Sequence, residues 1–167
     1  GIKDLYKVLA NDYHYGNPYN LVVFAGNHDM TRIYSQLKND FKLYKMAMAY
    51  IYTTRGIPQV YYGTEILMEG PADHGTLRAD FPGGWSNDKV NAFKGPGLKS
   101  EQKDAQSFTK KLLNWRKESL PITKGQFIHF YPNDGVYIYF RKYEDELVMV
   151  LMNNNNKTKN ISTGRFF

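Results

Sequence analysis

Cysteine is absent from this chain of 167 residues, which excludes disulfide bonds, thiolate metal ligands and thiol catalysis. Long apolar runs are also missing. The longest, residues 21–25, is far shorter than the ~20 residues that a membrane-spanning helix needs. We therefore expect a soluble protein that has no membrane partner.

Acidic side chains are the minority charge, with 16 Asp and Glu against 22 Lys and Arg and a net charge of +6. An excess of positive charge is typical of proteins that bind nucleic acids. Here the basic residues are scattered along the chain. The densest group lies on one expected helix and is typical of a solvent-exposed helix face; it consists of Lys110, Lys111, Arg116 and Lys117. No helix-turn-helix or RNA-binding signature accompanies the charge, so we expect no nucleic-acid partner.

Apolar side chains, by contrast, are plentiful. They make up 42% of the chain, and Tyr, Phe and Trp number 14, 10 and 2. This composition excludes intrinsic disorder and predicts a folded core. The length suits one domain, or one and a fraction.

The first half of the chain has the pattern of a parallel strand–helix–strand unit. Residues 21–25 form a continuous apolar run, typical of a strand covered on both faces. Apolar residues at three- and four-residue steps predict a helix over residues 40–56, and a second strand is expected at residues 59–62. Because parallel strands end at one edge of a sheet, residues 27–29 and 64–65 are expected on the same face, where α/β enzymes place their chemistry.

The second half changes its pattern twice. Residues 66–99 hold many Gly and Pro and predict a long irregular loop, of the kind that is usually functional. A helix is expected over residues 100–120, with Trp115 on its buried side. After that helix the period becomes two, which predicts antiparallel strands joined by tight turns. The chain therefore divides into an α/β part, residues 1–122, and a β part, residues 123–167.

Asp29 is the main candidate for chemistry, because it is a carboxylate beside the His28 imidazole, directly after a buried strand. There it could act as a nucleophile, a base or an electrostatic stabiliser, with His28 holding a hydroxyl or a ligand oxygen. The alternative is structural, with Asp29 capping a turn that leads to Thr31.

Two other kinds of site find little support in the sequence. The His and Asp residues that could supply metal ligands show neither a helix-spaced zinc pair nor a calcium-loop pattern, so we expect no metal site. No strand-to-helix Gly-x-Ser-x-Gly elbow is present, which argues against a serine hydrolase.

Three motifs in order carry a specific resemblance. Residues 24–29, Phe-Ala-Gly-Asn-His-Asp, are followed by residues 55–65, which begin Arg-Gly-Ile-Pro-Gln, and by residues 74–85, which end Asp-Phe-Pro-Gly-Gly-Trp. Together they resemble the α-amylase family, glycoside hydrolase family 13, and within it the branch of neopullulanases and cyclomaltodextrinases. The resemblance covers nearly the whole chain.

The resemblance implies the last β/α units of a (β/α)₈ TIM barrel followed by a partial antiparallel β-sandwich domain. It further implies a bacterial enzyme that hydrolyses or transfers α-glucosidic linkages with retention, acting on starch-derived oligosaccharides, cyclodextrins or pullulan. By its motif, Asp29 resembles the carboxylate that stabilises the transition state, as distinct from the nucleophile and the acid/base. His28 and Asn27 would contact the same sugar.

Three further residues are candidate substrate contacts under the resemblance. Arg78 is expected to bind a sugar or a loop, paired with Asp73, and the alternative is a purely structural ion pair. Trp85 is expected either to stack on a sugar in the cleft or to pack within its loop.

The family's nucleophile strand, with its Gly-x-Arg-x-Asp pattern, and its acid/base glutamate have no counterpart in the sequence. We therefore expect a fragment that is inactive by itself, with uncovered strand edges that favour self-association. No cofactor is expected in the chain, although the resemblance allows calcium in the parent enzyme, and the compartment stays open between periplasm and cytoplasm. The alternative hypothesis is a noncatalytic glucan-binding or structural module, in which the β part binds the glucan.

Overall fold

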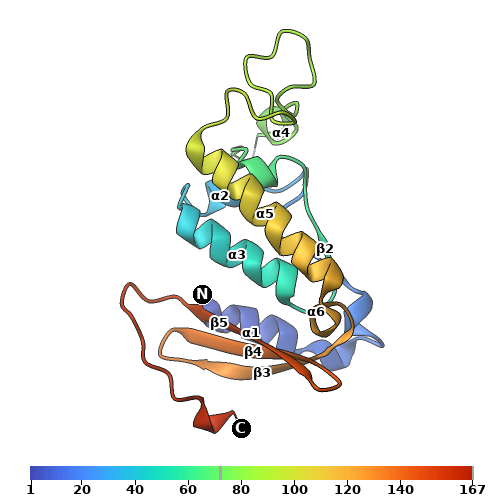
Figure 1. Ribbon diagram of the computed structural model, residues 1–167, viewed down its shortest axis with the longest axis vertical. Helices are drawn as coiled ribbons and strands as arrows, with labels where there is room; N and C mark the ends of the chain where they lie inside the picture. The colour runs from blue at the N-terminus through green and yellow to red at the C-terminus, as the bar shows by residue number, and fades with distance from the viewer. Residues whose placement is uncertain (72, 167) are drawn as a thin grey trace. The chain divides into compact units, whose positions relative to one another are not determined.

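The computed structural model describes residues 1–71 and 73–166 and divides into two compact units. Unit 1 combines Gly1–Pro18 with Leu120–Phe167, and unit 2 is Tyr19–Ser119. Phe167, the last residue of the predicted β part, lies outside the described residues. Unit 1 thus contains the first helix of the chain as well as the C-terminal strands (Figure 1).

Unit 2 is built on the predicted strand–helix–strand unit. Strands β1 (Val22–Phe24) and β2 (Ile57–Gln59) pair in parallel, with Val22 opposite Ile57. This pairing confirms the expected parallel unit. The expected position of the second strand, residues 59–62, is wrong, because strand pairing ends at Gln59. The rings of Tyr61 and Tyr62 pack on the Arg32 guanidinium instead.

Helix α3 (Phe41–Thr53) joins the two strands, as predicted. The Asp40 carboxylate caps its start by accepting from the N–H groups of Lys42 and Leu43, at 2.8 and 3.0 Å. At the other end the chain turns back at Gly56, whose φ is +96°. A Cβ there would lie 2.6 Å from the carbonyl oxygen of Leu21, so glycine allows β2 to start directly beside β1.

Helix α5 (Ser100–Glu118) runs alongside α3 in unit 2 (Figure 1). The burial of Ala105 fits the predicted inward face, but Trp115 is 38% exposed and Thr109 is buried instead. The reason is Arg116, whose guanidinium donates to the carbonyls of Tyr52 and Gly56 over 2.7 and 2.9 Å. These two bonds turn the Arg116 side of α5 toward α3.

The long loop of unit 2 contains a short helix, α4 (His74–Leu77), and a small core of its own. The 3-10 helix η3 (Thr64–Ile66) leads into this loop, whereas the short helix α2 (Ile33–Gln36) lies between β1 and α3. Ala92 and Leu98, from the irregular segment that follows α4, are buried together with Ile66. The segment is therefore anchored by packing, even though it lacks regular structure.

Unit 1 is an antiparallel sheet with helices packed on it. Strands β3 (Gln126–Asn133), β4 (Val136–Tyr143) and β5 (Glu146–Asn153) pair in that order, which confirms the expected antiparallel strands. Helix α1 (Ile2–Ala10) lies against one side of the sheet, where the Tyr6 ring stacks on His129 at 4.5 Å between centroids (Figure 1). Helix α6 (Leu120–Lys124) starts at the residue where the preceding helix was expected to end, because a proline is tolerated in the first turn.

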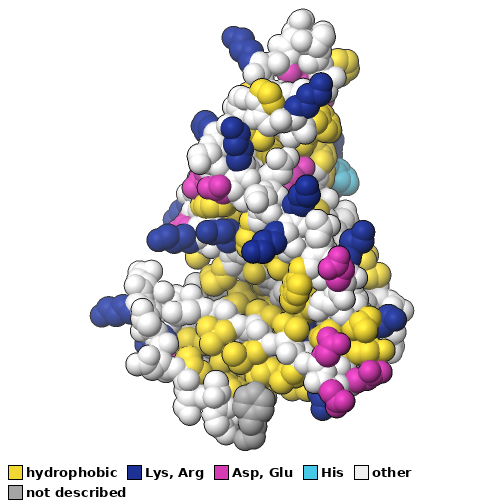
Figure 2. All heavy atoms as spheres, in the orientation of Figure 1, with side chains coloured by type: hydrophobic (Ala, Val, Ile, Leu, Met, Phe, Trp, Pro, Cys, Tyr) yellow, Lys and Arg dark blue, Asp and Glu magenta, His cyan; other side chains and the backbone are white. Residues whose placement is uncertain are grey.

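The other side of this sheet is apolar. Val136, Ile138 and Phe140 are buried there, and Figure 2 shows hydrophobic side chains gathered over the three strands. Two shorter elements, η1 (Asp12–His14) and η4 (Thr163–Arg165), flank the unit. Of the helices in the described ranges, none is long and apolar enough to cross a membrane.

Candidate active site

In the segment that follows β1, the side chain of Asn27 stabilises a turn of the backbone. Asn27 Oδ1 accepts from the backbone N–H of Asp29 over 2.9 Å, which closes a tight turn of the kind that asparagine favours. The turn comes three residues after the end of β1. Asp29 is therefore held at the carboxyl end of the strand, as the sequence predicted.

Asp29 lies between two nitrogen donors. Arg78 Nη2 donates to Asp29 Oδ1 over 2.9 Å, and His28 Nε2 lies 3.2 Å from Asp29 Oδ2. The Asp29 side chain is 58% exposed, so the ion pair of Asp29 and Arg78 is accessible to solvent and to ligands. We call His28, Asp29 and Arg78 the Asp29 cluster.

Asp73 does not join this cluster. Its carboxylate caps α4, accepting from the N–H groups of Gly75 and Thr76 and from the Thr76 hydroxyl, the last over 2.7 Å. The hydrogen bonds from Thr76 lower the pKa of Asp73. The expected pairing of Arg78 with Asp73 is wrong, because Asp73 is taken up by its own helix and Arg78 reaches Asp29 instead.

Arg32 connects the two chain segments that carry the Asp29 cluster, one around Asp29 and one around Arg78. The sequence did not predict this role. Its side chain is 3% exposed and donates to the carbonyls of Tyr62 and Leu77 over 2.7 and 2.9 Å. The guanidinium also lies over the rings of Tyr61 and Tyr62, at 4.8 and 5.0 Å. Arg32 lies three residues after Asp29, and Leu77 lies directly before Arg78. The hydrogen bond between Arg32 and the Leu77 carbonyl therefore holds the segments of Asp29 and Arg78 together.

Trp85 lies in the irregular segment after α4 and is 67% exposed. Its indole N–H donates to Asp80 Oδ2 over 2.8 Å. The ring is therefore fixed by one edge, while most of its surface faces solvent. Two roles were expected for Trp85, stacking on a sugar or packing within its loop. Its high exposure argues against packing within the loop.

The Asp29 cluster can recognise a polar, neutral ligand. The carboxylate accepts hydrogen bonds, the guanidinium donates them, and the opposite charges of Asp29 and Arg78 offset each other. Vicinal hydroxyl groups, which both donate and accept, match this set. Within residues 1–71 and 73–166, no group of three His, Asp or Glu side chains is placed to hold a metal ion.

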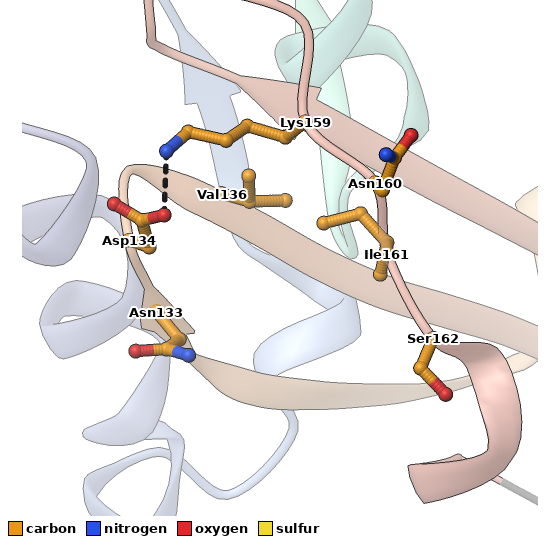
Figure 3. A pocket seen from close by; sticks show the side chains of 7 residues that line it. All are labelled: Asn133, Asp134, Val136, Lys159, Asn160, Ile161 and Ser162. Atoms are coloured by element: carbon orange, nitrogen blue, oxygen red, sulfur yellow. Dashed lines mark hydrogen bonds and ion pairs between the residues drawn. The ribbon is translucent and has the colours of Figure 1, made fainter.

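A hollow of about 210 Å³ opens in unit 1 between the β3–β4 turn and residues 159–162 (Figure 3). Lys159 Nζ lies 2.6 Å from Asp134 Oδ2 across it. None of the seven side chains drawn at this hollow is aromatic, so it offers no ring on which a sugar could stack. The hypothesis that the β part binds glucan gains nothing from this hollow.

Comparison with known proteins gives two family matches. The model described as "Alpha amylase, catalytic domain" matches residues 2–125, and the model described as "Cyclo-malto-dextrinase C-terminal domain" matches residues 127–167. The two matches together leave only the first residue and residue 126 uncovered.

Individual relatives are similar over most of this chain. A cyclomaltodextrin glucanotransferase from Thermoanaerobacterium thermosulfurigenes is 30% identical over 99% of the chain, and a cyclomaltodextrinase from Thermoanaerobacter pseudethanolicus is 29% identical over 83%. The crystal structure of an α-amylase from Geobacillus thermoleovorans, complexed with acarbose, matches 93% of the chain with 32% identity and a TM-score of 0.72. The chain covers 21%, 22% and 32% of these three proteins, so it spans about a fifth of the curated relatives' length.

Proposed function

Because the chain belongs to the α-amylase family, we propose that it supplies one side of the sugar-binding cleft of a retaining enzyme that acts on α-glucosidic linkages. The matched cyclomaltodextrinase and cyclomaltodextrin glucanotransferase support cyclic and linear starch-derived oligosaccharides as the substrate class. We propose an α-glucan as the ligand of the chain.

The observation that carries the proposal is the position of Asp29, exposed at the end of β1 and bracketed by His28 and Arg78. A retaining glycosidase needs two carboxyl groups about 5–5.5 Å apart, one as nucleophile and one as acid/base. We propose that Asp29 is neither of these but a third carboxylate, which accepts hydrogen bonds from sugar hydroxyls. Such bonds speed the reaction in so far as they tighten in the transition state.

His28 and Asn27 complete the proposed subsite in different ways. The His28 imidazole lies on the second oxygen of Asp29 and can donate to the same sugar. Asn27 acts through the backbone, because its side chain closes the turn that presents Asp29. We propose His28 as a sugar contact and Asn27 as the residue that positions the carboxylate.

The chain by itself is expected to bind maltoheptaose without cleaving it. Isothermal titration with maltoheptaose measures the binding, with cellohexaose, whose glucose units are β-linked, as the control for linkage. Product analysis after incubation with cyclodextrin, pullulan and maltooligosaccharides measures turnover. Turnover that disappears in the Asp29→Asn variant would contradict the proposal that the isolated chain is inert, and a lack of heat at millimolar maltoheptaose would contradict the proposal of a glucan ligand.

We also propose that copies of the chain associate through the β1–β2 sheet. Val22 and Ile57, paired on these strands, are each 53% exposed, and in the described residues each strand has only one strand neighbour. Exposed apolar strand edges favour pairing between chains. Sedimentation is expected to show species above the 19.4 kDa monomer, and Val22→Lys to shift them toward the monomer.

A matched control for that experiment is Val8→Lys, because Val8 is 63% exposed on α1 of unit 1 and does not belong to the β1–β2 sheet. It should leave the distribution unchanged. A clean monomer of the wild-type chain at every concentration would rule out the proposed association.

Domain organisation remains part of the proposal. We place the boundary near residue 122, between the barrel-type part and the antiparallel part. The two family models, which meet between residues 125 and 127, support a boundary in this region.

A further inference from the structure

A row of apolar side chains on α5 is accessible to solvent. Phe108, Leu112 and Trp115 follow one another at four- and three-residue steps, so they lie on one side of the helix. Together with Lys111 they line a hollow of about 410 Å³. Trp115 is 38% exposed. We call these four residues the α5 stripe.

The α5 stripe differs from the side of the helix that is used within unit 2. Ala105 and Thr109 are buried, and Arg116 donates to the carbonyls of Tyr52 and Gly56, which holds that side of α5 against α3. None of the residues of the α5 stripe belongs to the Asp29 cluster. An accessible apolar patch with a polar rim is typical of an interaction site.

The rim of the α5 stripe is basic. Lys110 and Lys111 are exposed, and in residues 1–71 and 73–166 neither has a carboxylate partner. Lys103 and Lys117 lie seven residues before and after Lys110, on the same side of the helix. The acidic residues of α5 lie near its two ends and are Glu101, Asp104 and Glu118. Figure 2 shows basic side chains gathered over α3 and α5, so a partner with negative charge matches this surface.

The charge and the shape of the α5 stripe favour one kind of partner. A second copy of the chain would bring Lys111 close to its own counterpart, because the residues nearest a two-fold axis meet themselves, and like charges repel. An anionic lipid surface would satisfy the charge, but it takes up apolar side chains that protrude, whereas the α5 stripe is hollowed. A hollow on a helix receives the side chain of a protein partner.

We propose that the α5 stripe docks an acidic amphipathic helix, whose apolar side chains enter the hollow and whose carboxylates pair with Lys110 and Lys111. The α5 stripe runs over seven residues, about 10 Å of helix, and the apolar side chains of a partner helix repeat at the same three- and four-residue steps. The charge pairs determine the choice of partner and its orientation more than the affinity. This surface takes a protein ligand and is independent of the sugar ligand of the Asp29 cluster.

The emission of Trp115 measures the docking in the Trp85→Phe variant, which keeps one of the two tryptophans of the chain. The probe is a synthetic helical peptide of about 16 residues, with leucine at three- and four-residue steps and glutamate on both sides of that row. Binding is expected to shift the Trp115 emission to shorter wavelength, because docking removes the indole from water. A peptide with lysine in place of glutamate is the control for charge and should not bind.

Charge reversal on the protein tests the basic rim. The double variant Lys110→Glu and Lys111→Glu is expected to bind the glutamate peptide about tenfold more weakly at low salt, and to bind the lysine peptide instead. The matched control is the double variant Lys89→Glu and Lys94→Glu, which makes the same change at exposed lysines of unit 2 outside α5. It should leave the affinity for both peptides unchanged.

Four results would overturn the proposal. The first is an unchanged Trp115 emission at millimolar glutamate peptide, and the second is equal affinity for the two peptides. The third is an emission shift with phosphatidylglycerol vesicles but not with the glutamate peptide, which would identify a membrane as the partner. The fourth is a shift on raising the concentration of the protein alone, which would identify a second copy of the chain.

Discussion

The Asp29→Asn variant is expected to bind maltoheptaose about 10- to 100-fold more weakly than the wild-type chain, because hydrogen bonds to a charged group each contribute roughly 1.5–3 kcal/mol. The change keeps the size of the side chain but removes its charge. One amide oxygen then replaces the two carboxylate oxygens that contact His28 and Arg78. Isothermal titration of both proteins under the same buffer and salt conditions measures the difference.

Asp145→Asn is the matched control for this prediction. Asp145 is an exposed residue in the β4–β5 turn of unit 1, so the substitution makes the same chemical change in a residue that does not belong to the Asp29 cluster. Its affinity should equal that of the wild-type chain. Equal affinity of Asp29→Asn and wild type would show that the glucan does not use this carboxylate.

Replacing Arg32 by alanine is expected to destabilise unit 2 by about 3 kcal/mol. The substitution removes two charge-assisted hydrogen bonds, to the part-buried carbonyl of Tyr62 and the buried carbonyl of Leu77. It also loses the contact of the guanidinium with the rings of Tyr61 and Tyr62. Urea unfolding followed by tryptophan emission measures the effect. Both tryptophans lie in unit 2, so the signal reports on this unit.

Two other variants define the cause of the loss. Arg78→Ala removes an arginine that is 50% exposed and bound to one exposed carboxylate, so its effect on unfolding should be within about 1 kcal/mol. Arg32→Lys keeps the charge but cannot reach both carbonyls with a planar fork, so an intermediate loss is expected. An unchanged urea midpoint for Arg32→Ala would mean that the hydrogen bonds of Arg32 to Tyr62 and Leu77 do not stabilise unit 2.

Elements with a strong local signal were predictable from the sequence. Helix α3 has a capping aspartate and regular apolar spacing, and the three strands of unit 1 have period two and compact turns. The place of Asp29 followed from the strand before it, because a residue just after a parallel strand must lie at the carboxyl edge. These features depend on residues that are near neighbours in the chain.

Features that depend on distant residues were not predictable. Arg32 finds its partners 30 and 45 residues away, and no local pattern marks it as a buried arginine. The expected partner of Arg78 was wrong because Asp73, five residues before it, is used by the first turn of α4. The predicted burial of Trp115 on α5 was wrong for a similar reason, since Arg116 binds carbonyls that lie 64 and 60 residues earlier in the chain.

The most direct test of the central claim, that the Asp29 cluster binds an α-glucan, is a nuclear magnetic resonance titration of the chain with maltoheptaose. Backbone amides and the Arg78 side-chain N–H report the position of the ligand residue by residue. We expect the largest shifts at residues 27–29 and at Arg78. Shifts confined to the hollow at residues 133–136 and 159–162, or no shifts at millimolar ligand, would contradict the claim.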